Sequence, residues 1–317
     1  MNLSFLHIFV FVIALIPAVI WLYLFLSKHH ANKWLVLFTF IGGMIAAKLI
    51  VTYQGYWDTT VNFIFFKVSL VDFRSNIEAL IVNTLVATFV VFLGVGVMEE
   101  FLKFWIMRFI SHRFFQSIDD VIELAIVSAL GFAFFENVLY FINQWGSLST
   151  SGFILFALFR VTIVTMVHVL CSGILGYYYG MAFFASPMLK IQVMKQGKSH
   201  PVLDFLKRVL HLKKSHVYHD QMMIIGLVTA MFLHAIYDFV LSLKVTLLGL
   251  PLYIPVMLLY FFGGYWYLSH LFEQKDFNLK LGLVGTRVMP KEDFVQLLGQ
   301  VQEIKAKMKE EVTEPVI

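Results

Sequence analysis

Long apolar runs divide this sequence, and each is about as long as a helix that crosses a lipid bilayer. A transmembrane helix needs roughly 20 mostly apolar residues, whereas a strand of a transmembrane barrel needs about 10 in an alternating pattern. Hydrophobic residues make up 60% of the chain and charged residues only 14%, against about 25% charged in soluble domains. The sequence therefore predicts an all-α, polytopic bundle of transmembrane helices.

We predict seven membrane spans, or eight if the long fifth run is broken. They cover residues 5–26, 34–53, 81–107, 121–144, 152–185, 222–245 and 248–271. The first run is long and aromatic and lacks a small-residue cleavage site, so we expect a retained helix rather than a secretory signal. The single cysteine, Cys171, lies within an apolar run, so no intramolecular disulfide is expected.

The distribution of basic residues predicts how the chain is oriented in the membrane. Lys and Arg gather after the first, third, fifth and last predicted spans, whereas the connection between the fourth and fifth spans contains neither. By the positive-inside rule, the N-terminus lies outside and the C-terminus lies in the cytoplasm. We expect the cell membrane as the location.

Composition divides the chain into four parts. Residues 1–76 hold the first two spans and a connection, 77–245 form a membrane core with a basic cytoplasmic loop at 186–220, 246–271 form the last span, and 272–317 form a cytoplasmic tail. Apolar residues recur at helical intervals in the tail, which predicts an amphipathic helix. They are Phe294, Leu297, Leu298, Val301, Ile304 and Met308.

Five of the ionisable side chains inside the apolar runs stand out, on four separate predicted helices. They are Glu99, Glu100, Glu136, His168 and His234. A charge at the bilayer centre costs at least about 2.5–3.5 kcal/mol, so such residues mark functional sites by default. We expect the four helices to gather them into one polar site. Carboxylates together with imidazoles suit a hydrolase that activates water, with or without a metal.

The third run, GVGVMEEFLKFWIMRF, contains two adjacent carboxylates. Glu99 and Lys103 are four residues apart, in the orientation that favours a helical ion pair, while Glu100 points about 100° away. Such a pair suits a general base. The alternative is that both carboxylates cap the span at the cytoplasmic interface.

The fourth run contains GFAFFENVLY. Glu136 follows Asp120 by 16 residues, roughly 24 Å along a helix, which places it beyond the cytoplasmic end. A site shared with Glu99 therefore requires that the third helix begin late, near Thr84, or that the fourth be tilted. Asn137 can donate a hydrogen bond to an oxyanion. Alternatively, both polar residues only join helices through hydrogen bonds.

The fifth and sixth runs each contain one buried histidine. Small residues follow His168 at four-residue intervals, so this face is expected to pack on another helix. They are Ser172, Gly176 and Gly180. Arg160, two turns earlier, either snorkels outward or holds a carboxylate. His234 and Asp238 are four apart and lie on one face, as an oriented imidazole or as two metal ligands.

In this order and spacing, the motifs resemble the PrsW family of intramembrane proteases, a branch of the superfamily that contains the CAAX prenyl proteases. EEFLK at Glu99–Lys103, GFAFFEN at Gly131–Asn137 and HAIYD at His234–Asp238 meet the family pattern EExxK, FxxxE and HxxxD. The resemblance covers roughly residues 94–240. It implies a multi-span helical peptidase that cuts membrane-associated substrates. In similar proteins the best-studied role is site-1 cleavage of a single-span anti-sigma factor.

The resemblance implies a metal-free mechanism that depends on glutamate. The expected catalytic residues are Glu99, Glu100, Glu136, His168, His234 and Asp238, with Lys103 and Asn137 in support. Glu99 or Glu100 takes a proton from the water that attacks the scissile carbonyl. His234, oriented by Asp238, polarises that carbonyl.

The remaining site residues assist this reaction. Glu136 and His168 position the water or protonate the leaving amine, Asn137 is a second oxyanion donor, and Lys103 balances the carboxylate charge. We expect no cofactor. The expected partners are the lipid bilayer and a membrane-protein or membrane-associated peptide substrate, with no nucleic acid.

A zinc hydrolase is the rival mechanism. His168, His234 and one acidic residue would supply three ligands and leave the fourth position for water. Glu136 is the preferred acidic ligand, with Glu99 and Asp238 as alternatives. The chain has no HExxH motif, so the ligands would have to converge from three helices.

Two other classes of protein also contain buried ionisable residues. Ion-coupled transporters line their pathways with such groups, but they often show inverted repeats, and this sequence shows no internal repeat. A non-catalytic membrane scaffold or sensor is the second class, because the superfamily resemblance extends to a non-catalytic subunit of the gamma-secretase complex. The two adjacent glutamates and the HxxxD motif favour catalysis.

Overall fold

A bundle of long helices forms the chain in this computed structural model. The structure describes residues 3–26, 33–55, 60–63, 66–69, 77, 80–81, 83–184, 214–243, 245–247 and 250–271. Two short antiparallel hairpins are the only strands in these ranges. The predicted helical membrane bundle is therefore confirmed in its main features.

The elements follow one another along the chain with two π-turns inside long helices. The helices are α1 (Leu3–Leu26), α2 (Lys33–Gly55), α4 (Thr84–Ser111), α5 (Ile118–Gln144), α6 (Thr150–Phe159), α7 (Thr165–Phe183), α10 (Lys214–Ser242) and α11 (Tyr253–Leu258). The π-turns are η2 (Arg160–Val164) and η3 (Leu259–Gly263), and η1 (His112–Phe114) is a short 3₁₀ helix. The hairpins pair β1 (Thr60–Phe63) with β2 (Phe66–Ser69) and β3 (Thr246–Leu247) with β4 (Leu250–Pro251). After η3 the helix continues to residue 271.

Five helices among the described residues are long and apolar enough to cross a membrane. They are Lys33–Thr52, Thr84–Phe114, Ile118–Gln144, Thr150–Phe183 and His216–Ser242. The fifth predicted span is one continuous helix, because η2 joins α6 to α7. In α1 a shorter apolar stretch, Ile8–Ile20, is found. The total of seven or eight spans, the orientation and the four-part division stay predictions.

The helix α10 begins earlier than the sequence predicts. Residues 214–220, assigned above to the basic loop, belong to its first turns. Val217 and Tyr218 are buried there at 6% and 3% exposure. Packing therefore extends the helix on the N-terminal side of the predicted apolar run, which begins at residue 222. The rest of the loop and the predicted amphipathic helix of the tail lie outside the described residues.

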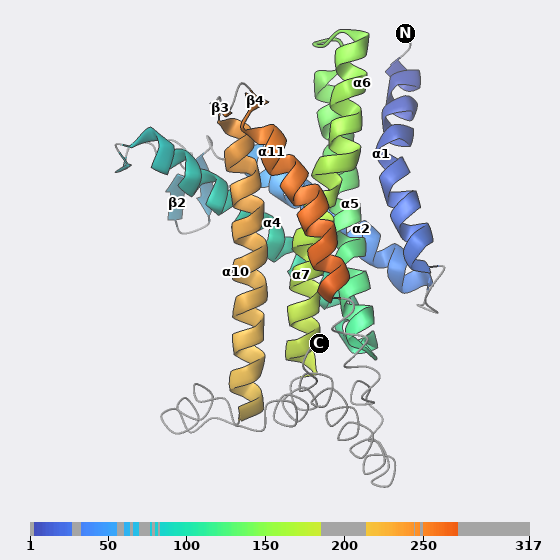
Figure 1. The fold of residues 1–317 in the computed structure, drawn as a ribbon, viewed down its shortest axis with the longest axis vertical. Helices are drawn as coiled ribbons and strands as arrows, with labels where there is room; N and C mark the ends of the chain where they lie inside the picture. Colours follow the sequence, from blue (N-terminus) through green and yellow to red (C-terminus); the bar gives the residue numbers. More distant parts are fainter. Residues whose placement is uncertain are drawn as a thin grey trace, which may run out of the picture.

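The helix α5 lies at the centre of the bundle. It packs against α1, α2, α4 and α7, while α10 packs against α7 and α4. In Figure 1, α1 and α10 stand on opposite sides, with α5 and α7 between them. Ile122, Ile126 and Leu130 recur every four residues along α5 and are at most 1% exposed. This stripe forms part of the apolar core against which the other helices are fixed.

Two N-terminal caps set the starting points of the helices that contain the carboxylates. Asn83 caps α4 by accepting hydrogen bonds from the backbone N–H groups of Leu85 and Val86, so the helix begins at Thr84. Ser117 forms a capping box at the start of α5. The late start of α4, one of the two arrangements that permit a shared site, is confirmed.

Glycines allow α2 and α5 to touch through their backbones. A Cβ atom on Gly43 would overlap the carbonyl oxygen of Ser128, and one on Gly131 would overlap that of Phe40. Small residues at helix crossings permit this close approach in membrane bundles. On α7, Gly176 likewise lies against α5, as the small-residue face predicts.

We predict that Gly131→Ala destabilises the protein by about 1–3 kcal/mol, because the added methyl overpacks a backbone contact. Thermal unfolding of the purified protein in detergent checks this. Gly263→Ala is the matched control, since a Cβ there meets only ordinary contacts with Leu259. An unchanged unfolding midpoint for Gly131→Ala would show that the crossing is not close-packed.

Candidate active site

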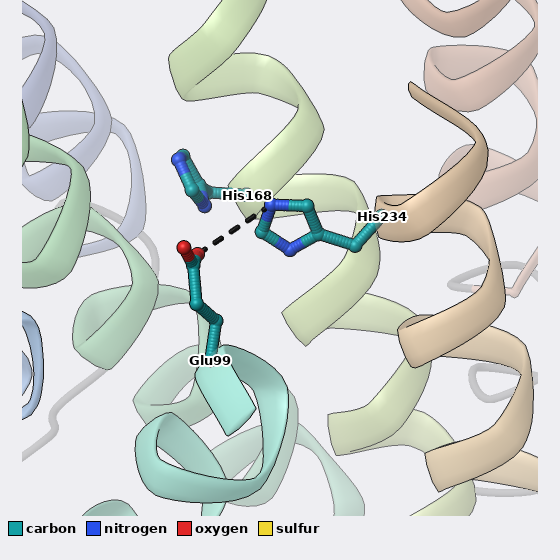
Figure 2. A group of neighbouring side chains, drawn as sticks. All are labelled: Glu99, His168 and His234. Carbon is teal, nitrogen blue, oxygen red and sulfur yellow. Dashed lines mark ion pairs between the residues drawn. The ribbon is translucent and has the colours of Figure 1, made fainter. Parts of the chain in front are cut away.

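Ionisable side chains from four helices meet inside the bundle. They are Glu99, Glu100 and Lys103 on α4, Glu136 on α5, His168 on α7, and His234 and Asp238 on α10. Figure 2 shows Glu99, His168 and His234 pointing toward one another from three different helices. The predicted convergence is confirmed, while the catalytic roles of these residues remain predictions.

Glu100 is fully buried, and its two oxygens bind three neighbours. Oε1 lies 2.7 Å from both Lys103 Nζ and His234 Nδ1, and Oε2 accepts a hydrogen bond from Ser172 Oγ at 3.2 Å. The carboxylate thus links α4 to α7 and α10. With its oxygens engaged by these donors, Glu100 is suited to holding the site together.

Glu99 has a different environment, although it is adjacent in sequence. Its Oε2 is buried and has no hydrogen-bond partner among the described residues. This oxygen lies 3.5 Å from His234 Nε2 and 3.7 Å from Lys103 Nζ. Of the two adjacent carboxylates, Glu99 is therefore the one with an oxygen that no hydrogen bond engages within the described chain.

Lys103 is 1% exposed and connects the carboxylates to His168. The predicted pair with Glu99 is present at 3.7 Å, but the lysine lies closer to Glu100. Its Nζ also lies 3.0 Å from His168 Nδ1 and 4.3 Å from the centre of the Phe132 ring. Because an ammonium group only donates, Nδ1 accepts, and the ring proton of a neutral His168 is on Nε2.

The π-turn η2 brings Arg160 to the same carboxylate as His168. Arg160 Nη2 and His168 Nε2 both lie 3.1 Å from Glu136 Oε2. In a regular α-helix, residues eight positions apart face roughly 80° apart. Because the π-turn adds one residue to a helical turn, the angle between the directions of Arg160 and His168 falls to roughly 20°. Of the two alternatives for Arg160, the structure shows that it holds a carboxylate.

Three hydrogen bonds form a closed cycle of contacts between Arg160, Asn137 and Thr165 at this π-turn. Arg160 Nε donates to Asn137 Oδ1 at 2.9 Å, Asn137 Nδ2 donates to Thr165 Oγ1 at 3.3 Å, and Thr165 Oγ1 donates to the carbonyl of Arg160 at 3.1 Å. The guanidinium also stacks on Tyr140 at 3.7 Å. Both ends of the Asn137 amide are therefore engaged in holding Arg160. The signal for Arg160 in the sequence was its charge within an apolar run.

His234 is held mainly by Glu100 and less closely by Asp238. Its Nδ1 lies 2.7 Å from Glu100, whereas its Nε2 lies 3.5 Å from Asp238 Oδ2. Helical spacing correctly indicates that Asp238 is near, but it does not reveal the closer partner on another helix. The ring centre of His234 lies 5.1 Å from that of His168, and the two rings meet edge to face.

A cavity of about 640 Å³ opens beside these groups. Its polar lining includes Glu99, Glu136, Arg160, His168, His234 and Asp238. Its lining also reaches Asn143 and Ser242, next to the C-terminal ends of α5 and α10. The volume is within the roughly 300–1,000 Å³ typical of ligand pockets. The cavity thus has room for part of an extended peptide and reaches the end of the bundle.

Glu99, His168 and His234 can each offer one ligand atom to a metal, and these atoms lie within 4.8 Å of one another. Glu99 Oε2 lacks a hydrogen-bond partner in the described chain, and Glu100 holds His234 Nδ1, which leaves Nε2 to bind. His168 fits only after it gives up the Nε2 proton that Lys103 places there. The acidic member is Glu99, not the preferred Glu136. Both histidines therefore fit a metal only in the neutral form that leaves the Nε2 lone pair free.

Comparisons with known proteins show which family this chain resembles. A family model described as PrsW family intramembrane metalloprotease matches residues 31–203, more than half of the chain. The chain is 34% identical over 97 residues to Protease PrsW of Geobacillus kaustophilus, which covers 30% of the chain and 39% of that relative. It is 36% identical over 93 residues to Protease PrsW of Oceanobacillus iheyensis, with 29% and 40% covered. The chain thus spans about two fifths of the length of the curated relatives that it matches, and no solved structure matches it. The extent of the family match shows that the chain belongs to the PrsW family.

Proposed function

We propose that this protein is an intramembrane peptidase that hydrolyses peptide bonds of membrane-associated proteins with water activated by Glu99. One observation carries the proposal: Glu99, a residue that lines the cavity, has a buried carboxylate oxygen without a hydrogen-bond partner in the described chain, 3.5 Å from an imidazole nitrogen. Such orphaned groups are uncommon in buried positions. A general base needs a free lone pair within reach of the attacking water.

The proposed reaction uses one water molecule for each peptide bond. Glu99 Oε2 takes a proton from water as the water oxygen attacks the carbonyl carbon. The tetrahedral intermediate then collapses, the C–N bond breaks, and Glu99 returns the proton to the leaving amine. The products are a new carboxylate and a new protonated amine, which takes the remaining proton of the water molecule, and Glu99 is regenerated.

The neighbouring residues hold and polarise the reactants in this proposal. Both nitrogens of His234 face carboxylate oxygens, which only accept, so we assign it as an imidazolium that donates through Nε2 to the carbonyl oxygen. Glu100 orients that ring. Lys103 and Glu136 engage the two nitrogens of His168, so His168 holds these two charged side chains in place beside the reactants.

A zinc-dependent version of the same hydrolase is the second candidate. The cluster of Glu99, His168 and His234 favours it, as does the description of the family as metalloproteases. A metal held there supplies Lewis-acid activation of water and of the substrate carbonyl. This version requires His234 to be neutral, with its Nε2 lone pair directed at the metal.

We predict that purified protein contains less than one equivalent of metal and that a chelator leaves cleavage unchanged. Metal analysis and a cleavage assay on the same preparation check this, with His234→Ala as the inactive control. One equivalent of zinc, with activity that is lost on chelation and restored by zinc, would establish the second candidate instead. Cleavage at the wild-type rate by His234→Ala would show that His234 has no catalytic role, whereas no cleavage by wild-type protein, with or without zinc, would favour a transporter or scaffold role.

The substrate class follows from the position of the cavity. With the predicted orientation, the C-terminal ends of α5 and α10 face the outside, so the cavity reaches the outer side of the membrane. We propose a single-span membrane polypeptide as substrate, and an anti-sigma factor is the first to test. In this proposal, residues 77–245 contain the catalytic core.

A further inference from the structure

Three residues that line the cavity described above each have a buried polar atom without a hydrogen-bond partner in the described chain. Glu99 Oε2, Arg160 Nη2 and Tyr237 Oη are all buried and have no hydrogen-bond partner within the described parts of the chain. All three residues line the cavity. Arg160 Nη2 is still ion-paired with Glu136, and Glu99 is the proposed base. Tyr237 alone of the three has no role so far.

Tyr237 contrasts with its neighbour Tyr260. The two rings lie with their centres 5.6 Å apart, and both are well buried, at 2% and 7% exposure. Tyr260 donates its hydroxyl proton to the carbonyl of Leu233 at 2.7 Å. The hydroxyl of Tyr237 has no such partner within the described chain. A buried hydroxyl without a partner lowers stability, so the presence of the Tyr237 hydroxyl beside the cavity needs an explanation.

Peptide hydrolysis needs hydrogen-bond donors where negative charge develops on the carbonyl oxygen. The sequence suggested Asn137 for this purpose, but its amide is engaged by Arg160 and Thr165. His168 Nε2 is likewise engaged by Glu136. Tyr237 follows His234 by three residues on α10, about one helical turn away, and its O–H is a donor.

We infer that Tyr237 is a further catalytic residue: its hydroxyl donates a hydrogen bond to the carbonyl oxygen of the scissile peptide bond. This inference rests on the proposed peptidase function. The bond strengthens as the oxygen gains charge in the tetrahedral intermediate, and it complements the donor from His234. No proton is transferred by Tyr237, so the balance of the reaction is unchanged.

The test compares Tyr237→Phe with Tyr260→Phe, two changes that each remove one hydroxyl from adjacent buried rings. Tyr237→Phe is expected to lower kcat by about 10²–10³-fold with little change in KM, the usual effect of losing one oxyanion donor. Its thermal unfolding midpoint should equal or exceed that of the wild type, because an unpartnered hydroxyl is removed. Tyr260→Phe should lower the midpoint and keep a kcat close to wild type.

Unchanged kcat in Tyr237→Phe would overturn the inference. A loss of activity accompanied by a lowered unfolding midpoint would also overturn it, because lost stability would then explain the lost activity. Glu99→Gln is measured on the same substrate to separate the two proposals. If Glu99→Gln is inactive and Tyr237→Phe is fully active, only the role of Tyr237 fails. If Glu99→Gln cleaves as fast as wild type, the assignment of Glu99 as the base fails, while the kcat of Tyr237→Phe still decides this inference. If wild-type protein cleaves no substrate, the peptidase proposal fails and this inference fails with it.

Discussion

Glu99→Gln is expected to lower kcat for peptide cleavage by about 10²–10⁴-fold, the range attributed to general-base catalysis. The amide keeps the size of the side chain but cannot accept a proton from water. Because Glu99 Oε2 has no hydrogen-bond partner in the described residues, few native contacts are lost. The variant should therefore fold with a thermal unfolding midpoint close to wild type.

Glu100→Gln is the matched comparison, since it makes the same chemical change one residue away. Here the amide replaces a buried carboxylate that binds Lys103, His234 and Ser172. We expect the unfolding midpoint to fall, because a charged hydrogen-bond network loses its acceptor. Cleavage rates and thermal unfolding of both variants check the pair. Full activity in Glu99→Gln with loss only in Glu100→Gln would exchange the two assignments.

Lys103→Met is expected to destabilise the protein by about 3–5 kcal/mol, because it leaves a buried carboxylate without its cation. Lys103 is 1% exposed and lies 2.7 Å from Glu100 Oε1. Its loss also removes the donor that fixes His168 Nδ1. Activity should fall together with stability.

The stability measurement is chemical or thermal unfolding in detergent, with Lys48→Met as control because Lys48 is exposed on α2. Adding Glu100→Gln to Lys103→Met should restore part of the lost stability, since both charges are then removed. Equal stability of Lys103→Met and wild type would show that the lysine is not the counter-charge of this site.

The sequence predicts the helices and their convergence because both depend on local composition. Apolar runs determine the spans, and ionisable residues within them have to face one another or a cavity. For example, the spacing of His168 and the following small residues correctly predicts a face packed on α5. The capped start of α4 at Thr84 is the condition that brings its carboxylates to the level of Glu136.

Other features of the site depend on tertiary contacts that no periodicity reveals. Helical spacing turns Glu99 and Glu100 about 100° apart around the helix axis, but only the neighbouring helices decide which of the two carboxylates faces the cavity. Arg160 reaches Glu136 through a π-turn, and one extra residue in a helix is invisible in an apolar run. The orphaned hydroxyl of Tyr237 is also recognisable only when every neighbour is known.

The most direct test of the central claim is cleavage of a single-span polypeptide by purified protein in lipid bilayers, run in ¹⁸O-labelled water and followed by mass spectrometry. We predict two products, with one ¹⁸O atom in the new carboxylate, formed by wild type and not by Glu99→Gln. Failure of wild-type protein to cleave, with or without added zinc, or identical labelled products from Glu99→Gln, would contradict it.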